Sequence, residues 1–214
     1  MKKLLLFSLI LSSLFSTPSP KTIIMTPDSS SVTTIDSGKE IKIIRVQDVS
    51  HKLVDDFTKT SRACPPFCIQ PTKVNPNIDT IAELEVFKFM KNQIKNQKGI
   101  LVDARLKSWF ELETIPSAIN ISYRTLLNSN KQKITRIFKL LGMKVEANGE
   151  WNFNNAKELT IFDNGVWCAQ ANHLIKTLLK YHYPTSKLHY YRSGLQGWKL
   201  LGLTTVVHKE IIKD

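Results

Sequence analysis

A single cysteine stands where a short apolar run gives way to a helical pattern, a position suited to a nucleophile. Cys168 follows the run 159–162 and a turn signal at 163–165, and the apolar residues after it recur at helical spacing. The unpaired N–H groups and the positive dipole end of such a helix favour thiolate over thiol. The thiolate is the reactive form of cysteine. The competing interpretation is a small apolar residue buried under the helix.

Two further strand ends carry charged residues. The apolar run 100–103 ends in Asp103-Ala104-Arg105, and the run 187–191 is followed by Arg192. Strands that alternate with helices predict an α/β fold, an open and mostly parallel sheet with helices on both faces. Because such sheets place their chemistry beyond the carboxyl ends of the strands, these charged residues and Cys168 are expected along one edge. The two arginines provide either a positive field for an anion or an ion pair with Asp103.

The remaining pattern predicts the elements between these strand ends. Helices are expected over 80–96, 125–141 and from Cys168 to about 181, and a short one carries Trp198. A further strand is expected over 118–122, and a polar excursion over 143–157. Trp167 and Trp198 are interpreted as core residues.

The first 73 residues divide into three segments by composition. Residues 1–16 combine two lysines with an apolar run and a small-polar end, which predicts a secretory signal peptide and a periplasmic or secreted protein. Residues 17–39 are rich in Ser, Thr and Pro and predict a flexible linker. Residues 40–73 predict an extension with a strand at 41–46 and a helical stretch to Phe57, before a domain over 74–214. A membrane contact is expected only through an uncleaved signal segment.

The net charge is strongly positive. It is +12 for the whole chain and +10 without Lys2 and Lys3 of the signal segment. The charge is dispersed, without the Lys/Arg clusters that mark a nucleic-acid groove, so no nucleic-acid partner is expected. A positive field of this kind attracts small oxyanions or an anionic surface, and much of it is also consistent with a solvated face.

Three cysteines in an exported chain leave one without a partner. Cys64 and Cys68 are separated by Pro-Pro-Phe and can be bridged if the chain turns, so a disulfide is expected between them outside the cytoplasm. Cys168 is then the free thiol. The alternative is that Cys64 or Cys68 resolves an oxidised Cys168. The five histidines lack ligand spacing, so no metal is expected.

Three motifs in order resemble the rhodanese family. They are Ile100-Leu-Val-Asp-Ala-Arg105 with Ile115-Pro-Ser-Ala-Ile-Asn120, the strand, cysteine and helix around Cys168, and the closing segment from Tyr191 to Leu203. The resemblance covers about 74–207, and the two cysteine segments are similar to a subgroup of exported bacterial members. It implies a mainly five-stranded parallel sheet. The strand before Cys168 would lie between those that end at Asp103 and Arg192.

The resemblance also implies sulfur transfer through a cysteine persulfide. Cys168 would take the outer sulfur of thiosulfate or of a persulfide donor and pass it to a thiol or cyanide. Backbone N–H groups and side chains would bind the sulfur, with Asp103 in structural support. Ala169, Gln170 and Ala171 bring no charge to this loop, which departs from many family members and weakens the case for thiosulfate. The substrate-binding residues expected are Ala169, Gln170, Ala171, Asn172, His173, Arg105 and Arg192.

Three function classes follow. The first is an exported rhodanese-type sulfurtransferase with no cofactor, a small anionic sulfur donor and a thiol acceptor, either a small molecule or a protein. The second is a low-turnover rhodanese-like sulfur carrier or redox-partner binding module in the periplasm, in which the extension could cover the site. The third is a cysteine phosphatase or arsenate reductase, which generally needs an Arg where Leu174 stands.

Overall fold

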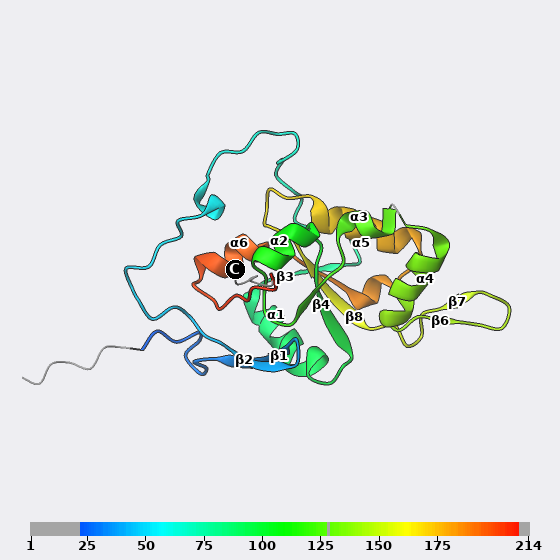
Figure 1. The fold of residues 1–214 in the computed structure, drawn as a ribbon, viewed down its shortest axis with the longest axis horizontal. Coiled ribbons are helices and arrows are strands. Elements are labelled where there is room, and N and C mark those ends of the chain that lie inside the picture. The colour runs from blue at the N-terminus through cyan, green and yellow to red at the C-terminus, as the bar shows by residue number, and fades with distance from the viewer. Residues whose placement is uncertain (1–21, 128, 210–214) are drawn as a thin grey trace, which may run out of the picture.

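A five-stranded parallel sheet forms the centre of the computed structural model, which describes residues 22–127 and 129–209 (Figure 1). The strand order β3-β9-β8-β4-β5 places β8, the strand before Cys168, between β9 and β4. This confirms the predicted fold class and the predicted neighbours of the central strand. The five strands are β3 (Asp79–Ile81), β4 (Gly99–Asp103), β5 (Ala118–Asn120), β8 (Glu158–Phe162) and β9 (Leu188–Tyr191).

The two central strands are apolar because both of their faces are covered. In β4 and β8 the pairing sets Leu101 opposite Thr160 and Asp103 opposite Phe162, and all four side chains are buried. A strand buried on both faces needs a nearly continuous apolar run rather than alternation. Both strands end at the same sheet edge, where their polar residues follow.

Helices cover both faces of the sheet, as Figure 1 shows. One face packs against α3, α4 and α5, whose buried residues form one apolar cluster with Ile161 and Tyr190. The other packs against α1 and α6, with Phe162 and Trp198 in a second cluster. The helices are α1 (Glu83–Phe89), α2 (Lys107–Leu112), α3 (Tyr123–Leu127), α4 (Lys131–Leu140), α5 (Gln170–Lys180) and α6 (Gly194–Leu200); short helical turns are Asp56–Thr58, Met90–Ile94 and Thr185–Lys187.

Three predicted elements differ in the structure. The helix expected over 80–96 begins only at Glu83, after β3, and its last part, Met90–Ile94, is a π-helical turn. The helix expected over 125–141 is two helices, and the side chain of Asn130 caps the second by accepting from the Lys133 N–H at 2.9 Å. The excursion over 143–157 contains the hairpin β6 (Lys144–Val145) and β7 (Trp151–Asn152), in which Trp151 stacks on Tyr181.

The prediction of a flexible linker is wrong for residues 32–39, which belong to an antiparallel hairpin. Its strands are β1 (Val32–Asp36) and β2 (Lys39–Ile43), and Val32 and Ile43 are buried against the α1–α6 face. The reason is a two-residue alternation in which Val32, Thr34 and Asp36 point inward. The extension then has only the short turn Asp56–Thr58 in place of the expected helix. Residues 1–16, the predicted signal peptide, lie outside the described residues, as do 17–21.

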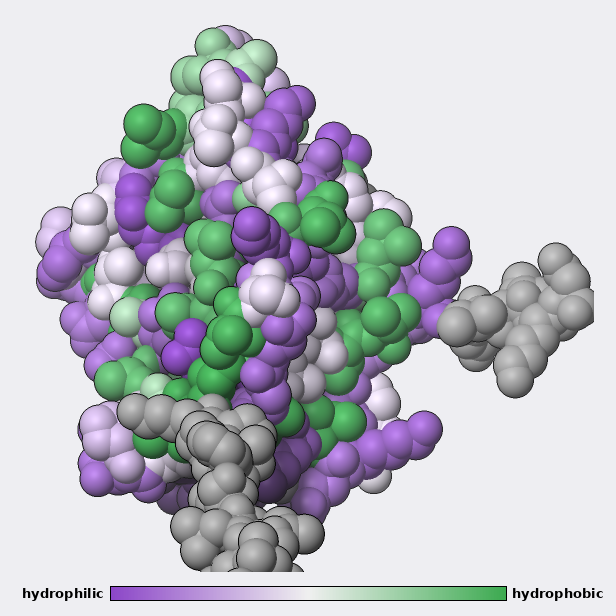
Figure 2. All heavy atoms as spheres, turned by 90° about the vertical axis from the view of Figure 1, so that its left-hand side faces the viewer, coloured by the Kyte–Doolittle hydropathy of each residue, from purple (hydrophilic) through white to green (hydrophobic). Residues whose placement is uncertain are grey.

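The extension runs along the outside of the domain from β2 to β3, on the left and over the top in Figure 1. Seen from that side, hydrophobic and hydrophilic residues are intermixed over the surface (Figure 2). No helix within residues 22–127 and 129–209 is long and apolar enough to cross a membrane.

Candidate active site

Cys168 lies in the connection from β8 to α5, at the carboxyl end of the central strand. The strand ends at Phe162, and the helix begins at Gln170, so five residues separate the strand from the cysteine. Gly165 allows the turn, with a φ of 147° and the Ser193 carbonyl oxygen 3.1 Å from where a Cβ would stand. The Cys168 side chain is free of disulfides and buried, with 4% of the residue exposed.

The residue that directly follows β8 is Asp163, whose carboxylate lies within hydrogen-bond reach of the Cys168 sulfur. It is completely buried and accepts hydrogen bonds from the N–H groups of Gly165 (3.1 Å) and Ala171 (2.8 Å). Burial raises the pKa of the Asp163 carboxyl to about 7. Sequence reasoning treated this residue only as part of a turn, although its place at a strand end was the signal that it belongs to the site.

The Cys168 sulfur is close to polar groups of this connection and of the start of α5. The Asn164 side-chain Nδ2 donates to Sγ at 3.6 Å. Burial first, and then the negative charge of Asp163, raise the pKa of the Cys168 thiol to about 12. The backbone N–H groups of Gln170 and Asn164 favour the thiolate but do not offset these effects. In this structure desolvation and the neighbouring carboxylate outweigh the helix end, which was expected from the sequence to favour the thiolate.

The residues expected to wrap the sulfur belong to the start of α5 instead. Ala171 is fully buried and gives its N–H to Asp163, while Ala169 and Gln170 are half-buried. Asn172 is buried and donates to the Gln70 side chain at 2.9 Å. His173 is exposed on the helix, with its ring 5.9 Å from that of Tyr123. Of these five residues, Gln170 provides a backbone donor to the sulfur.

Asp103 and Arg105 form a buried ion pair at the end of β4. The Arg105 guanidinium donates to both carboxylate oxygens of Asp103, at 2.7 to 3.1 Å, and Thr114 Oγ1 donates to the same carboxylate at 2.8 Å. Arg105 Nη1 also donates to Asn164 Oδ1 at 3.3 Å. The structure thus shows the ion pair considered from the sequence. It also links the pair to the sulfur, because Asn164 contacts both.

Arg192, which was expected to bind the sulfur, binds the backbone of the extension instead. Its guanidinium donates to the carbonyl oxygens of Gln70 (2.7 Å) and Pro71 (3.2 Å). The Gln70 N–H in turn donates to the carbonyl of Val166, inside the cysteine connection, at 2.8 Å. Arg192 therefore holds the segment that lies against this connection.

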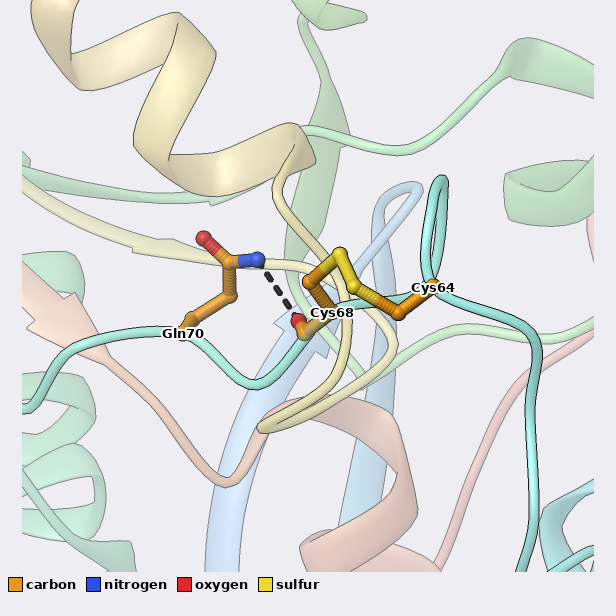
Figure 3. The surroundings of a disulfide bond; sticks show 3 residues. All are labelled: Cys64, Cys68 and Gln70. Carbon is orange, nitrogen blue, oxygen red and sulfur yellow. Dashed lines mark hydrogen bonds between the residues drawn. A yellow bond between two sulfur atoms is a disulfide. The ribbon is translucent and has the colours of Figure 1, made fainter.

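A disulfide joins Cys64 to Cys68 in the segment that covers the cysteine connection (Figure 3). Figure 3 also shows Gln70, whose side-chain nitrogen donates to the Cys68 carbonyl at 2.7 Å. Between the two cysteines, Phe67 meets the Trp167 ring edge-on with centroids 5.6 Å apart. Trp167 is half-buried under this cover, whereas Trp198 is fully buried in the core.

A pocket of about 310 Å³ lies between the extension and the cysteine connection. The extension contributes Arg62 and Phe67 to its lining, and the domain contributes Arg105, Asn164 and Trp167. Asn164 therefore lines the pocket and contacts the Cys168 sulfur as well. Among residues 22–127 and 129–209, no group of three or more His, Cys, Asp or Glu side chains could hold a metal ion.

The fold and the connection after its central strand define an open parallel α/β domain with a buried cysteine at the carboxyl edge of its sheet. Residues 87–201, more than half of the chain, match the family described as Rhodanese-like domain. The chain belongs to that family.

Solved structures of low sequence identity resemble the chain. The BH2092 protein from Bacillus halodurans is 14% identical, with 64% of this chain and 85% of that chain covered and a TM-score of 0.44. A thiosulfate sulfurtransferase from Pseudomonas aeruginosa is 17% identical over 62% of this chain and 21% of its own, with a TM-score of 0.41. A single-domain sulfurtransferase from Saccharomyces cerevisiae is 17% identical over 58% and 91%, also with a TM-score of 0.41. No curated protein matches the chain.

Proposed function

We propose that this rhodanese-like protein is a low-turnover sulfur carrier, in which Cys168 accepts a sulfane sulfur and holds it as a persulfide. The observation that carries the proposal is the state of the Cys168 thiol: it is buried, its pKa is raised to about 12, and Asp163 stands beside it. A thiol in this state is a weak nucleophile at neutral pH because only its thiolate attacks sulfur. The cover formed by Gln70 and the disulfide segment further limits access.

The sulfur transfer takes place in two steps, each of which conserves protons and electrons. The Cys168 thiol gives its proton to the Asp163 carboxylate, and the thiolate attacks the outer sulfur of thiosulfate or of a persulfide donor. The sulfur–sulfur bond of the donor breaks, and sulfite or a thiolate leaves with the bonding electrons. A thiol acceptor then attacks the outer sulfur of the Cys168 persulfide, which leaves a persulfide on the acceptor and returns Cys168. This is covalent transfer in two steps.

A faster sulfurtransferase is the second candidate, and Asp163 is the observation that favours it. A carboxyl group with a pKa of about 7 accepts and returns a proton near neutral pH, which is what a general base must do. Asp163 is also the charged group that raises the pKa of Cys168. Opening of the cover by a donor or a partner protein would then convert the buried thiol into a working nucleophile.

Mass spectrometry and steady-state rates together test the proposal. Thiosulfate or glutathione persulfide should add one sulfur to the protein over minutes to hours, and Cys168→Ser should abolish the addition while the domain stays folded. Sulfur that loads onto the Ser variant would reject Cys168. Rapid multiple turnover with thiosulfate and cyanide would favour the second candidate. Failure of every donor to add sulfur would reject both.

We also propose that residues 1–16 direct the chain out of the cytoplasm, on the strength of their composition. A fusion that carries these residues should be found in the periplasm or the medium, shortened near Ser16. Full-length protein that stays soluble in the cytoplasm would contradict this.

A further inference from the structure

The pocket between the extension and the domain is a preformed cavity with walls held on both sides. The Gln196 side chain donates to the Phe57 carbonyl at 2.8 Å and accepts from the Trp167 ring nitrogen at 2.8 Å, and Lys199 binds the carboxylates of Asp55 and Glu113. The Arg62 guanidinium lies over the Trp167 ring, 3.8 Å from its centroid. A cavity of about 310 Å³ is at the small end of the range for ligand sites.

Most of the lining is aromatic or aliphatic. Its apolar side chains come from the extension, from α2, from the cysteine connection and from α6, and they are Phe57, Phe67, Trp109, Leu112, Trp167 and Leu195. Flat rings on several sides bind an apolar body well, because each ring offers a large area at little cost in conformational entropy. A small hydrated dianion would gain little from such walls.

The charges around the pocket do not favour an anion either. Arg105 is neutralised by Asp103, and Lys199 is shared between two carboxylates. Arg62 packs on an aromatic ring, and Asp56 also lines the pocket. The lining and its direct partners bring three cations against four carboxylates: Arg62, Arg105 and Lys199 against Asp55, Asp56, Asp103 and Glu113. The pocket is therefore slightly acidic, although the whole chain is basic.

Asn164 connects the pocket to the sulfur, although Cys168 itself is not among the lining residues. This side chain lines the cavity, accepts from Arg105 at 3.3 Å and donates to the Cys168 sulfur at 3.6 Å. The outer sulfur of a persulfide on Cys168 would extend one bond beyond Sγ. A ligand in the pocket can therefore contact the residue that touches the Cys168 sulfur.

We infer that this pocket binds a small neutral thiol with an aromatic or branched aliphatic body, the acceptor that removes sulfur from Cys168. The claim that the pocket binds such a thiol depends on the pocket lining alone. The claim that this thiol removes sulfur from Cys168 rests on the proposed function. In the reaction the acceptor thiol gives its proton to the ionised outer sulfur of the persulfide, the acceptor thiolate attacks that sulfur, and the bond between the two sulfurs breaks. The Cys168 sulfur leaves as a thiolate and takes a proton from the protonated Asp163. The acceptor departs as its persulfide.

Binding is tested with the unreactive probe 4-fluorobenzyl alcohol, followed by ¹⁹F NMR on the full mature protein. Leu112→Trp should fill the pocket, because Leu112 lines it with 57% of its surface exposed. Leu140→Trp is the matched control, since Leu140 is also the last residue of a helix and is 72% exposed. We expect saturable binding that weakens at least tenfold in Leu112→Trp and stays unchanged in Leu140→Trp. The inference would be overturned if binding of the probe does not saturate, if both variants bind the probe equally, or if 4-fluorobenzoate binds more tightly than the alcohol.

The acceptor role is tested on protein already loaded with sulfur. We measure the rates at which benzyl mercaptan and 2-mercaptoethanesulfonate remove that sulfur. Each rate is divided by the rate of the same thiol with free glutathione persulfide, which corrects for the intrinsic reactivity of the thiol. We expect the corrected ratio to favour benzyl mercaptan at least tenfold, and Leu112→Trp to remove most of this preference. A preference for the anionic thiol would overturn the acceptor assignment. Protein that never loads sulfur would count against the proposed function, whereas the probe experiment decides the pocket separately.

Discussion

Replacement of Asp163 by Asn should raise the thiolate fraction of Cys168 and speed its alkylation, because it removes the negative charge beside the sulfur, whereas it should slow sulfur transfer, in which Asp163 takes the thiol proton. Asp163 is completely buried, and its charge is the second-largest cause of the raised pKa of Cys168, after burial. Asn has nearly the same size, and its carbonyl oxygen can still accept one of the two N–H groups that bind the carboxylate.

The size of the effect follows from the two pKa values. A pKa of about 12 instead of 9.0 lowers the thiolate fraction of Cys168 at pH 7 by about a thousandfold. Because burial is the largest cause and remains in the variant, the Asn substitution should recover only part of this. We expect alkylation of Cys168 to become about tenfold faster at pH 8, which corresponds to about one pKa unit.

The pH dependence of alkylation gives a second signature. Asp163 loses its proton near pH 7, and the new charge disfavours the Cys168 thiolate as the pH rises. The logarithm of the wild-type rate should therefore rise by less than one per pH unit between pH 6 and 8. In Asp163→Asn it should rise by one per unit throughout. The measurement is iodoacetamide alkylation followed by intact mass, in which Cys64 and Cys68 are protected by their disulfide.

Asp79→Asn is the matched control, since Asp79 is an exposed carboxylate at the start of β3. It should leave both the rate and the slope unchanged. A wild-type rate equal to that of a free thiol would refute the reasoning, and so would identical profiles for wild type and Asp163→Asn.

The remaining predictions concern stability and the cover. The folded pKa of Asp163, about 7, lies above its model-compound value of 3.8, so stability should fall as the pH rises from about 4 to 7. At pH 8 the Asp163→Asn variant should therefore have a higher free energy of unfolding than the wild type, by up to about 4 kcal/mol minus the contribution of the lost hydrogen bond. At pH 4 this advantage should be absent, and urea titrations at the two pH values measure the difference. Arg105→Met should destabilise the domain by about 3–5 kcal/mol because it leaves the buried Asp103 carboxylate unpaired, and a loss under 1 kcal/mol would contradict the ion pair's role. The double Ser variant of Cys64 and Cys68 should change global stability little, because the loop is short, yet speed alkylation of the buried cysteine; an unchanged alkylation rate would argue against a cover.

Much of the fold could be predicted from local pattern. The apolar runs before Asp103, Cys168 and Arg192 indicated buried parallel strands, and the structure has β4, β8 and β9 at those places, in the expected order. The four-residue separation of Cys64 and Cys68 allowed a bridge, and their Cα atoms are 4.7 Å apart. These features depend on neighbours in the sequence or on the few topologies that alternating strands and helices allow.

The hairpin over Val32–Ile43 could not be predicted in the same way. Its inward residues include Thr34 and Asp36, so the alternation carries little hydrophobic signal. The Asp36 carboxylate is buried because it accepts the N–H of Ser117, 81 residues away. A polar strand of this kind is stabilised by partners that composition does not reveal.

The candidate site also combines features that follow from the sequence with features that only packing decides. The sequence by itself determined that a cysteine, an aspartate and an arginine meet at one sheet edge, because parallel strands end together. Only the tertiary structure decided the state of that cysteine. The helix end that favours a thiolate is a local feature, but the pKa also depends on burial and on Asp163, which takes the Ala171 N–H. The cover depends on Gln70 reaching Asn172 across 102 residues. Desolvation and competition for hydrogen-bond donors arise from packing, and packing exists only once the chain has folded.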